Sequence, residues 1–198
     1  SIDNDIWEPE IVKVGEIGHK DEDHVVRGST PESLAELRTA FGPESLVTAG
    51  NASGVVDGAA AVVIKSATQA AKDGDKPLAK IVSWGIDGLE PAIMAYGPVP
   101  SSRLALEKAG LNIEDIDRWE INEAFAGQAV ACIKDLGLDI NKVNVNGGAI
   151  ALGHPLGCTG AKLSIQLLDE MKNRNQRYGM VTACVGGGQG ISGIFERL

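Results

Sequence analysis

Apolar residues recur along the chain at two spacings, and together these predict strands alternating with helices. Short apolar runs at 81–85, 119–121 and 143–146, and longer ones at about 179–185 and 190–196, are typical of strands. Apolar residues at helical spacing predict helices over about 101–110, 122–136 and 158–173. This alternation predicts an α/β domain from about residue 77 to residue 198.

The segment before residue 77 has a sparser pattern. Thr30 followed by Pro31 predicts a helix start, with Leu34, Leu37 and Phe41 at helical spacing. Further on, the predicted elements are a strand at 47–49, an apolar run of strand length at 59–64 and a capped helix from Ser66 to about Ala71. The charged stretch 19–24 is typical of a solvated loop. These elements are too few to bury a core of their own.

Composition narrows the class of protein. The chain has 198 residues, 43% of them hydrophobic, and a net charge of −9, which argues against a general nucleic-acid-binding surface. No apolar run approaches the roughly 20 residues that a membrane-spanning helix needs, and the first residues do not read as a signal peptide. The three cysteines and three histidines show no metal-ligand spacing. We therefore expect a reduced, cytoplasmic protein without a membrane span or a metal site.

One histidine stands in a glycine-rich loop. Residues 147–160 contain His154 together with several glycines and precede a predicted helix. A histidine near a helix N-terminus is disfavoured as imidazolium, and a neutral imidazole can act as a base or a hydrogen-bond donor. The alternative is a structural histidine in a tight turn, but the density of glycine around His154 favours a functional role.

A cysteine is followed by a second glycine-rich turn. Cys184 ends a predicted strand and precedes Gly186, Gly187 and Gly188. A cysteine beside exposed backbone N–H groups suits proton transfer or thiolate chemistry, and those groups could hold an oxyanion. The alternative is a small buried residue before a hairpin. The same turn matches the dinucleotide fingerprint G-x-G-x-x-G, which is rejected because it needs a following helix and strand.

A third stretch, Asn122-Glu123-Ala124-Phe125-Ala126, places an amide, a carboxylate and an aromatic ring together. By itself it is also what an N-cap asparagine with a first-turn glutamate would produce.

Taken together, these stretches resemble the thiolase family closely in their residues, order and spacing. A fourth match lies upstream, at 48–54 and 57–60. The resemblance covers essentially the whole chain. It implies a thiolase-like α/β fold with a mixed β-sheet covered by helices, layered αβαβα in the complete enzyme. Residues 1–45 would belong to the coenzyme A-binding loop domain, 46–76 to the end of the N-terminal half and 77–198 to the C-terminal domain.

The resemblance also implies an activity and the residues that perform it. Thiolases are acyl-CoA C-acyltransferases, which join two acyl-CoA molecules by Claisen condensation or cleave a 3-ketoacyl-CoA. His154 matches the histidine that activates the nucleophilic cysteine, and Asn122 matches the asparagine of the same oxyanion hole. Cys184 matches the acid/base cysteine, and the N–H of Gly186 matches a donor of the second oxyanion hole. Positions lining the pantetheine tunnel are matched by Ser33, Leu37, Phe41, Ala49, Ala52, Ser53 and Phe125.

The nucleophile itself has no match among Cys132, Cys158 and Cys184. In the family it lies in the first half, so we expect these 198 residues alone to be inactive. The implied partners are acyl-CoA and coenzyme A, which are substrates rather than cofactors, and the implied assembly is a homodimer or homotetramer.

Two other interpretations stay open at this point. One is a non-catalytic thiolase-like subunit that binds acyl-CoA or scaffolds an assembly. The other is a ketoacyl-synthase-type enzyme, which would normally use two histidines in this half, whereas only His154 follows residue 24.

Overall fold

A computed structural model describes residues 6–12, 15 and 28–198 of the chain. It divides into two compact units, Ser1–Gly50 and Asn51–Leu198. The charged stretch 19–24, expected to be a solvated loop, lies outside the described residues. The three-part domain division expected from the sequence stays a prediction.

The described part of the first unit contains a 3-10 helix, η2 (Glu8–Glu10), and one short α-helix, α1 (Pro31–Ala35). Thr30 and Ser33 form the capping box that starts α1. The helix was expected to continue to Phe41, but it ends at Ala35, and Leu37 only closes a tighter turn onto the Leu34 carbonyl. The strand expected at 47–49 is a single bridge between Thr39 and Thr48.

The second unit is built on a four-stranded mixed sheet in the order β1-β4-β3-β2. Its strands are β1 (Ala79–Gly88), β2 (Arg118–Ile121), β3 (Tyr178–Val185) and β4 (Gln189–Arg197). β4 is antiparallel to both β1 and β3, whereas β2 is parallel to β3. The predicted α/β class and mixed sheet are therefore confirmed.

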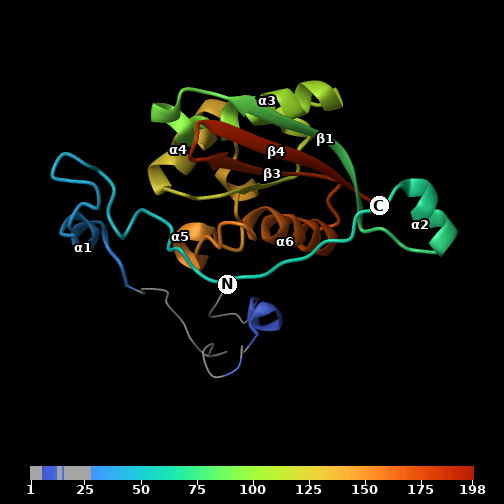
Figure 1. Ribbon diagram of the computed structural model, residues 1–198, viewed down its shortest axis with the longest axis horizontal. Helices are drawn as coiled ribbons and strands as arrows, with labels where there is room; N and C mark the ends of the chain where they lie inside the picture. The colour runs from blue at the N-terminus through green and yellow to red at the C-terminus, as the bar shows by residue number, and fades with distance from the viewer. Residues whose placement is uncertain (1–5, 13–14, 16–27) are drawn as a thin grey trace. The chain divides into compact units, whose positions relative to one another are not determined.

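Helices cover both faces of this sheet. The α-helices of the second unit are α2 (Ala67–Asp73), α3 (Pro98–Ala109), α4 (Ala126–Leu136), α5 (Ala149–Leu152) and α6 (Thr159–Asn173). The 3-10 helices of this unit are η3 (Pro91–Tyr96), η4 (Ile113–Asp115) and η5 (Ile140–Lys142). Figure 1 shows α3 on one face of the sheet and α6 on the other. The helical spacing that predicted α3, α4 and α6 follows from their buried faces.

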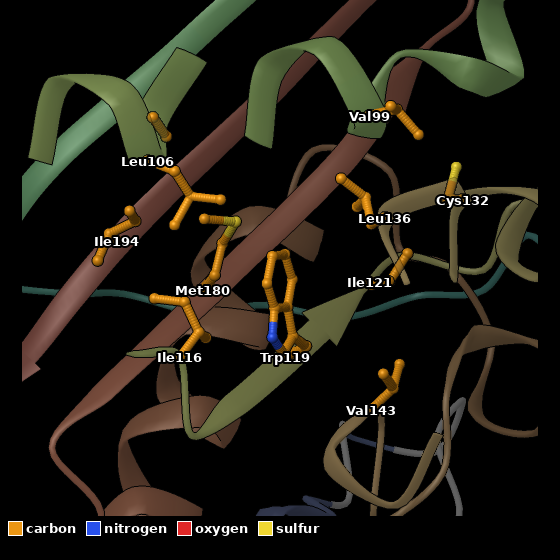
Figure 2. Close-up of a cluster of buried hydrophobic side chains, with 11 residues drawn as sticks. Val99, Leu106, Ile116, Trp119, Ile121, Cys132, Leu136, Val143, Met180 and Ile194 are labelled. Carbon is orange, nitrogen blue, oxygen red and sulfur yellow. The ribbon is translucent and has the colours of Figure 1, made fainter. Parts of the chain in front are cut away.

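The core lies in two clusters, one on each face of the sheet. The larger cluster joins α3 and α4 to the strands, and Trp119 of β2 lies at its centre between Met180 and Leu136 (Figure 2). The smaller one packs Leu163, Leu167 and Met171 of α6 against Val181. Because β2 is buried on both faces, its backbone is a rigid support for the residues that follow it.

Two further runs expected to be strands are not. Residues 59–64 form no strand, and Val62, Val63 and Ile64 are exposed, because no strand among the described residues pairs with them. Residues 143–146 make only one parallel bridge, from Val143 to Trp119. Asn144 then takes a left-handed conformation with φ of 44°, which ends the pairing with β2.

Candidate functional site

The site lies where the parallel strands β2 and β3 end. Ile121, the last residue of β2, pairs with Thr182, and the N–H of Asn122 donates to the Thr182 carbonyl at 2.9 Å. Cys184 stands two residues further along β3. Because parallel strands end at the same edge of a sheet, Asn122 and Cys184 both lie at this edge.

His154 is held beside Asn122 although 32 positions separate them in the chain. Nδ2 of Asn122 lies 3.2 Å from Nε2 of His154, and Nδ1 of His154 lies 2.6 Å from the hydroxyl of Thr159. The backbone N–H of His154 donates to the Gly54 carbonyl at 2.8 Å. The imidazole is thus held through both ring nitrogens and through its backbone.

These contacts select one tautomer of His154. The Thr159 hydroxyl donates its hydrogen to the Pro155 carbonyl at 3.1 Å, so towards the imidazole it acts as an acceptor. Nδ1 therefore carries the hydrogen, and Nε2 carries the lone pair that faces the Asn122 amide. The hydrogen-bond pattern leaves Nε2 as the basic atom of the site.

Burial shifts the pKa of His154 and that of Cys184. It lowers the pKa of His154 by disfavouring the imidazolium, and the charge of Lys162 lowers it further. The sequence predicted this direction from a helix N-terminus, whereas the structure attributes it mainly to burial. Burial likewise raises the pKa of the Cys184 thiol, so His154 is neutral and Cys184 protonated at neutral pH.

Asn122 presents a buried, unused acceptor. The residue is 1% exposed, and among the described residues no partner bonds its Oδ1 atom. A buried polar atom without a partner is costly, so one that persists in a fold commonly marks a functional position.

The turn after Cys184 is positioned by an unusually close backbone contact. A Cβ added at Gly97, just before α3, would lie 2.5 Å from the Gln189 carbonyl oxygen, and one added at Gly190 would overlap Gly97 itself. Only glycine at both positions allows this approach. Within the turn, the N–H of Gly186 donates none of the loop and turn hydrogen bonds found among the described residues.

Residues 51–54 join the edge through backbone atoms. Ala52 bridges to Phe125, the N–H of Ser53 donates to the Ala124 carbonyl at 3.1 Å, and the N–H of Ala126 donates to the Asn51 carbonyl at 2.8 Å. Ala52, Ser53 and Phe125, three of the positions expected to line a pantetheine tunnel, are therefore brought together.

The remaining tunnel positions lie in the first unit. Ser33 uses its hydroxyl in the capping box of α1. Phe41 is 74% exposed, and Ala49 is also exposed. The Leu37 side chain packs close to the backbone of Gly50, where an added Cβ would lie 2.8 Å from it. The role of these four residues in binding stays a prediction.

Three residues to which the sequence assigned no role in the site lie around it: Glu123, Asn144 and Thr159. Helix α4 begins at Ala126 with Phe125 as its N-cap, so the interpretation of Asn122 and Glu123 as an N-cap and first-turn pair is wrong. The position of Thr159, five residues after His154 at a helix start, was the available signal for its role. Asn144 offered none, because its contacts depend on tertiary structure.

Cys132 is separate from this chemistry. Its thiol is fully buried between Gln128 and the Ala95 carbonyl, and burial raises its pKa to about 11. No three His, Cys, Asp or Glu side chains of the described residues gather in a way that could hold a metal ion. No helix in the described part of the chain is both long enough and apolar enough to cross a membrane.

Comparisons with known proteins identify the family of the chain. Residues 75–197 match the family model for the C-terminal domain of thiolase, and residues 2–68 match that for the N-terminal domain. An acetyl-CoA acetyltransferase of Rhizobium meliloti is 51% identical over 192 residues, which are 96% of this chain and 49% of the relative. A 3-ketoacyl-CoA thiolase of Erwinia tasmaniensis is 53% identical over 189 residues, with 93% and 49% covered.

Solved structures give the same result. The Bacillus anthracis acetyl-CoA acetyltransferase superposes with a TM-score of 0.90 at 43% identity, covering 100% of this chain and 52% of that protein. Human mitochondrial 3-ketoacyl-CoA thiolase in complex with CoA superposes with a TM-score of 0.86 at 39% identity, covering 100% and 50%. The chain spans about half the length of the relatives it matches. Its motifs, fold and matched domains show that the chain belongs to the thiolase family.

Proposed function

We propose that the full-length protein is an acyl-CoA C-acyltransferase, a thiolase that condenses two acyl-CoA molecules or cleaves a 3-ketoacyl-CoA with coenzyme A. The observation that carries the proposal is the pair formed by the Asn122 amide and Nε2 of His154, 3.2 Å apart at the sheet edge that also holds Cys184. The proposal is supported by relatives named acetyl-CoA acetyltransferase and 3-ketoacyl-CoA thiolase, which are 51% and 53% identical to this chain.

The tautomer of His154 suits the first half of the reaction. A nucleophilic cysteine, which this proposal requires from outside the 198 residues, transfers its proton to the lone pair of Nε2 and attacks the thioester carbonyl. The carbon–sulfur bond to coenzyme A breaks, and an acyl-enzyme remains. The Asn122 amide and the imidazole border the position of the developing oxyanion, where fixed donors lower the barrier.

The protonated thiol of Cys184 suits the second half. It can donate its proton to the departing coenzyme A thiolate and is then itself a thiolate. That thiolate removes the α-proton of a second acyl-CoA, whose carbon attacks the acyl-enzyme carbonyl and releases the nucleophilic cysteine. The proton on His154 returns to that cysteine, so no proton is left over. The N–H of Gly186 is available for the oxyanion of the second thioester.

The partners follow from the chemistry. Acyl-CoA and coenzyme A are the substrates, and the reaction as written needs no further cofactor. The relative solved in complex with CoA supports the binding of coenzyme A. We propose that Ser33, Leu37, Phe41, Ala49, Ala52, Ser53 and Phe125 take part in that binding. We further propose a homodimer or homotetramer in the cytoplasm, which size measurement and cell fractionation of the full-length protein would check.

The direct test is thiolytic turnover. Full-length protein supplied with acetoacetyl-CoA and coenzyme A should form two molecules of acetyl-CoA, measured by chromatography of the products. Purified residues 1–198 should show no turnover, even if they bind coenzyme A, because none of their three cysteines matches the nucleophile. Binding of acyl-CoA by the full-length protein without any turnover would contradict the proposal and favour a non-catalytic role.

A further inference from the structure

Glu123 makes a bridge that connects the two halves of the His154–Asn122 pair. Its Oε1 accepts from Nδ2 of Asn144 at 2.8 Å, and its Oε2 accepts from the N–H of Ile150 at 3.1 Å. Glu123 directly follows Asn122 in the chain, and Ile150 stands four residues before His154. One carboxylate therefore ties the segment that presents the amide to the loop that presents the imidazole.

The anchor of this bridge is rigid. Oδ1 of Asn144 accepts from the N–H of Ile121 at 2.8 Å, and Nδ2 donates to the Ile121 carbonyl at 2.9 Å. Because a flipped amide would mismatch both bonds, the orientation of the Asn144 side chain is determined. Nδ2 must therefore present a donor towards Glu123, just as Ile150 does from the other side.

The loop is shaped to receive the carboxylate. A Cβ added at Gly148 would overlap the carboxyl carbon and both oxygens of Glu123. The backbone of Gly148 has φ of −113°, which any residue can adopt, so the constraint at this position is the space that the carboxylate fills.

We propose that Glu123 is a positioning residue that holds the 147–154 loop so that Nε2 of His154 stays in register with the Asn122 amide. This role rests on the function proposed above. Glu123 contacts neither ring nitrogen of His154, and its effect passes through Ile150 and the short helix α5. Two donors face it, so two acceptors are required, and an ionised carboxylate supplies them.

Glu123→Gln tests this requirement with almost no change in shape. In either orientation of the new amide, its NH₂ group faces a donor, and one of the two contacts is lost. In the full-length protein we expect acyl-enzyme formation from acetyl-CoA to slow by about tenfold to a hundredfold, with KM for acetyl-CoA changed less than about twofold. The matched control is Glu107→Gln, at an exposed position of α3, which should acylate at the wild-type rate.

A double-mutant cycle separates positioning from a general loss of structure. If Glu123 acts through His154, Glu123→Gln should slow acylation no further in a His154→Ala background. Equal slowing in both backgrounds would overturn the proposal, and so would wild-type acylation by Glu123→Gln. If Glu123→Gln does not fold, Glu123→Asp is measured in the same way. Its side chain is one methylene shorter, so the same two acceptors lie further from the donors on Asn144 and Ile150.

A spectroscopic readout keeps this proposal separable from the proposed function. In ¹⁵N-histidine NMR spectra of the full-length protein, with His154→Ala as the assignment control, the wild type should show His154 as the Nδ1–H tautomer. Glu123→Gln should shift the populations of the two His154 tautomers towards those of a solvent-exposed histidine. Glu107→Gln should leave them unchanged. If the wild type shows no turnover, the proposed function fails while this comparison still decides the role of Glu123. Unchanged His154 signals in Glu123→Gln would overturn it.

Discussion

Thr159 determines which nitrogen of His154 carries the proton. Its hydroxyl lies 2.6 Å from Nδ1 and donates its hydrogen to the Pro155 carbonyl, so it can only accept a hydrogen bond from Nδ1. Thr159→Val keeps the shape but leaves the partly buried Nδ1–H without an acceptor, which costs up to about 1–3 kcal/mol. The other tautomer, with the hydrogen on Nε2, should then become populated. We expect acyl-enzyme formation to slow in the full-length protein, measured by single-turnover acylation with labelled acetyl-CoA.

Thr159→Ser is the matched control for this prediction. It restores the hydroxyl and should acylate close to the wild-type rate. If valine and serine at position 159 give equal rates, the hydroxyl does not control the imidazole.

Cys184 and His154 should fail at different steps in the full-length protein. Cys184→Ser is nearly isosteric and should still trap a covalent acetyl group from radiolabelled acetyl-CoA while failing to condense it. His154→Ala should trap that group slowly or not at all, because the nucleophile loses its base. Should both variants acylate at the wild-type rate, or Cys184→Ser be the one that does not, the two roles have been assigned wrongly.

Glu120 should make stability fall as pH rises. Burial raises its pKa from 4.5 to about 8, with Glu123 and Glu170 adding to the rise and Lys162 and Arg118 opposing it. Between these two values the folded protein keeps a proton that the unfolded chain has lost, so the free energy of unfolding falls by at most about 1.4 kcal/mol per pH unit. Glu120→Gln removes this dependence.

The measurement is the melting temperature of the full-length protein at two pH values. The difference between Glu120→Gln and the wild type should be larger, and in favour of the variant, at pH 8.5 than at pH 5. A difference that stays the same at both pH values would show that Glu120 is ionised in the folded protein.

Gly148→Ala should destabilise the fold because its methyl group overlaps the Glu123 carboxylate. Overpacking of this kind costs about 1–3 kcal/mol, measured as the free energy of unfolding in urea. In a Glu123→Ala background the space is vacant, so the same substitution should cost much less. If Gly148→Ala lowers the free energy of unfolding equally in both backgrounds, its methyl group does not clash with the Glu123 carboxylate.

The sequence predicted the α/β class and most helices and strands because these elements bury one regular face. Leu163, Leu167 and Met171 on α6, for example, recur at helical spacing and meet the sheet. The run at 59–64 was wrongly predicted because apolar composition does not say whether a pairing strand is available. For the site, His154, Cys184 and Asn122 could be singled out from their motifs, although their roles stay predictions.

The supporting residues could not be found in this way. Glu123 looked like part of a helix start, and only the position of Ala126 as the first residue of α4 frees it for the bridge to Ile150. Asn144 acts through a left-handed backbone and contacts with residues 21 and 23 positions away, which no local pattern encodes.

The contact between Gly97 and Gly190 also has a consequence for evolution. Because each glycine excludes a side chain at the other, neither can be replaced first without pushing α3 away from the turn that follows Cys184. Single-step drift at either position is therefore blocked. A distant homologue that has lost one of the two glycines must have re-routed this turn, and inheritance of the chemistry at Cys184 should not be assumed for it.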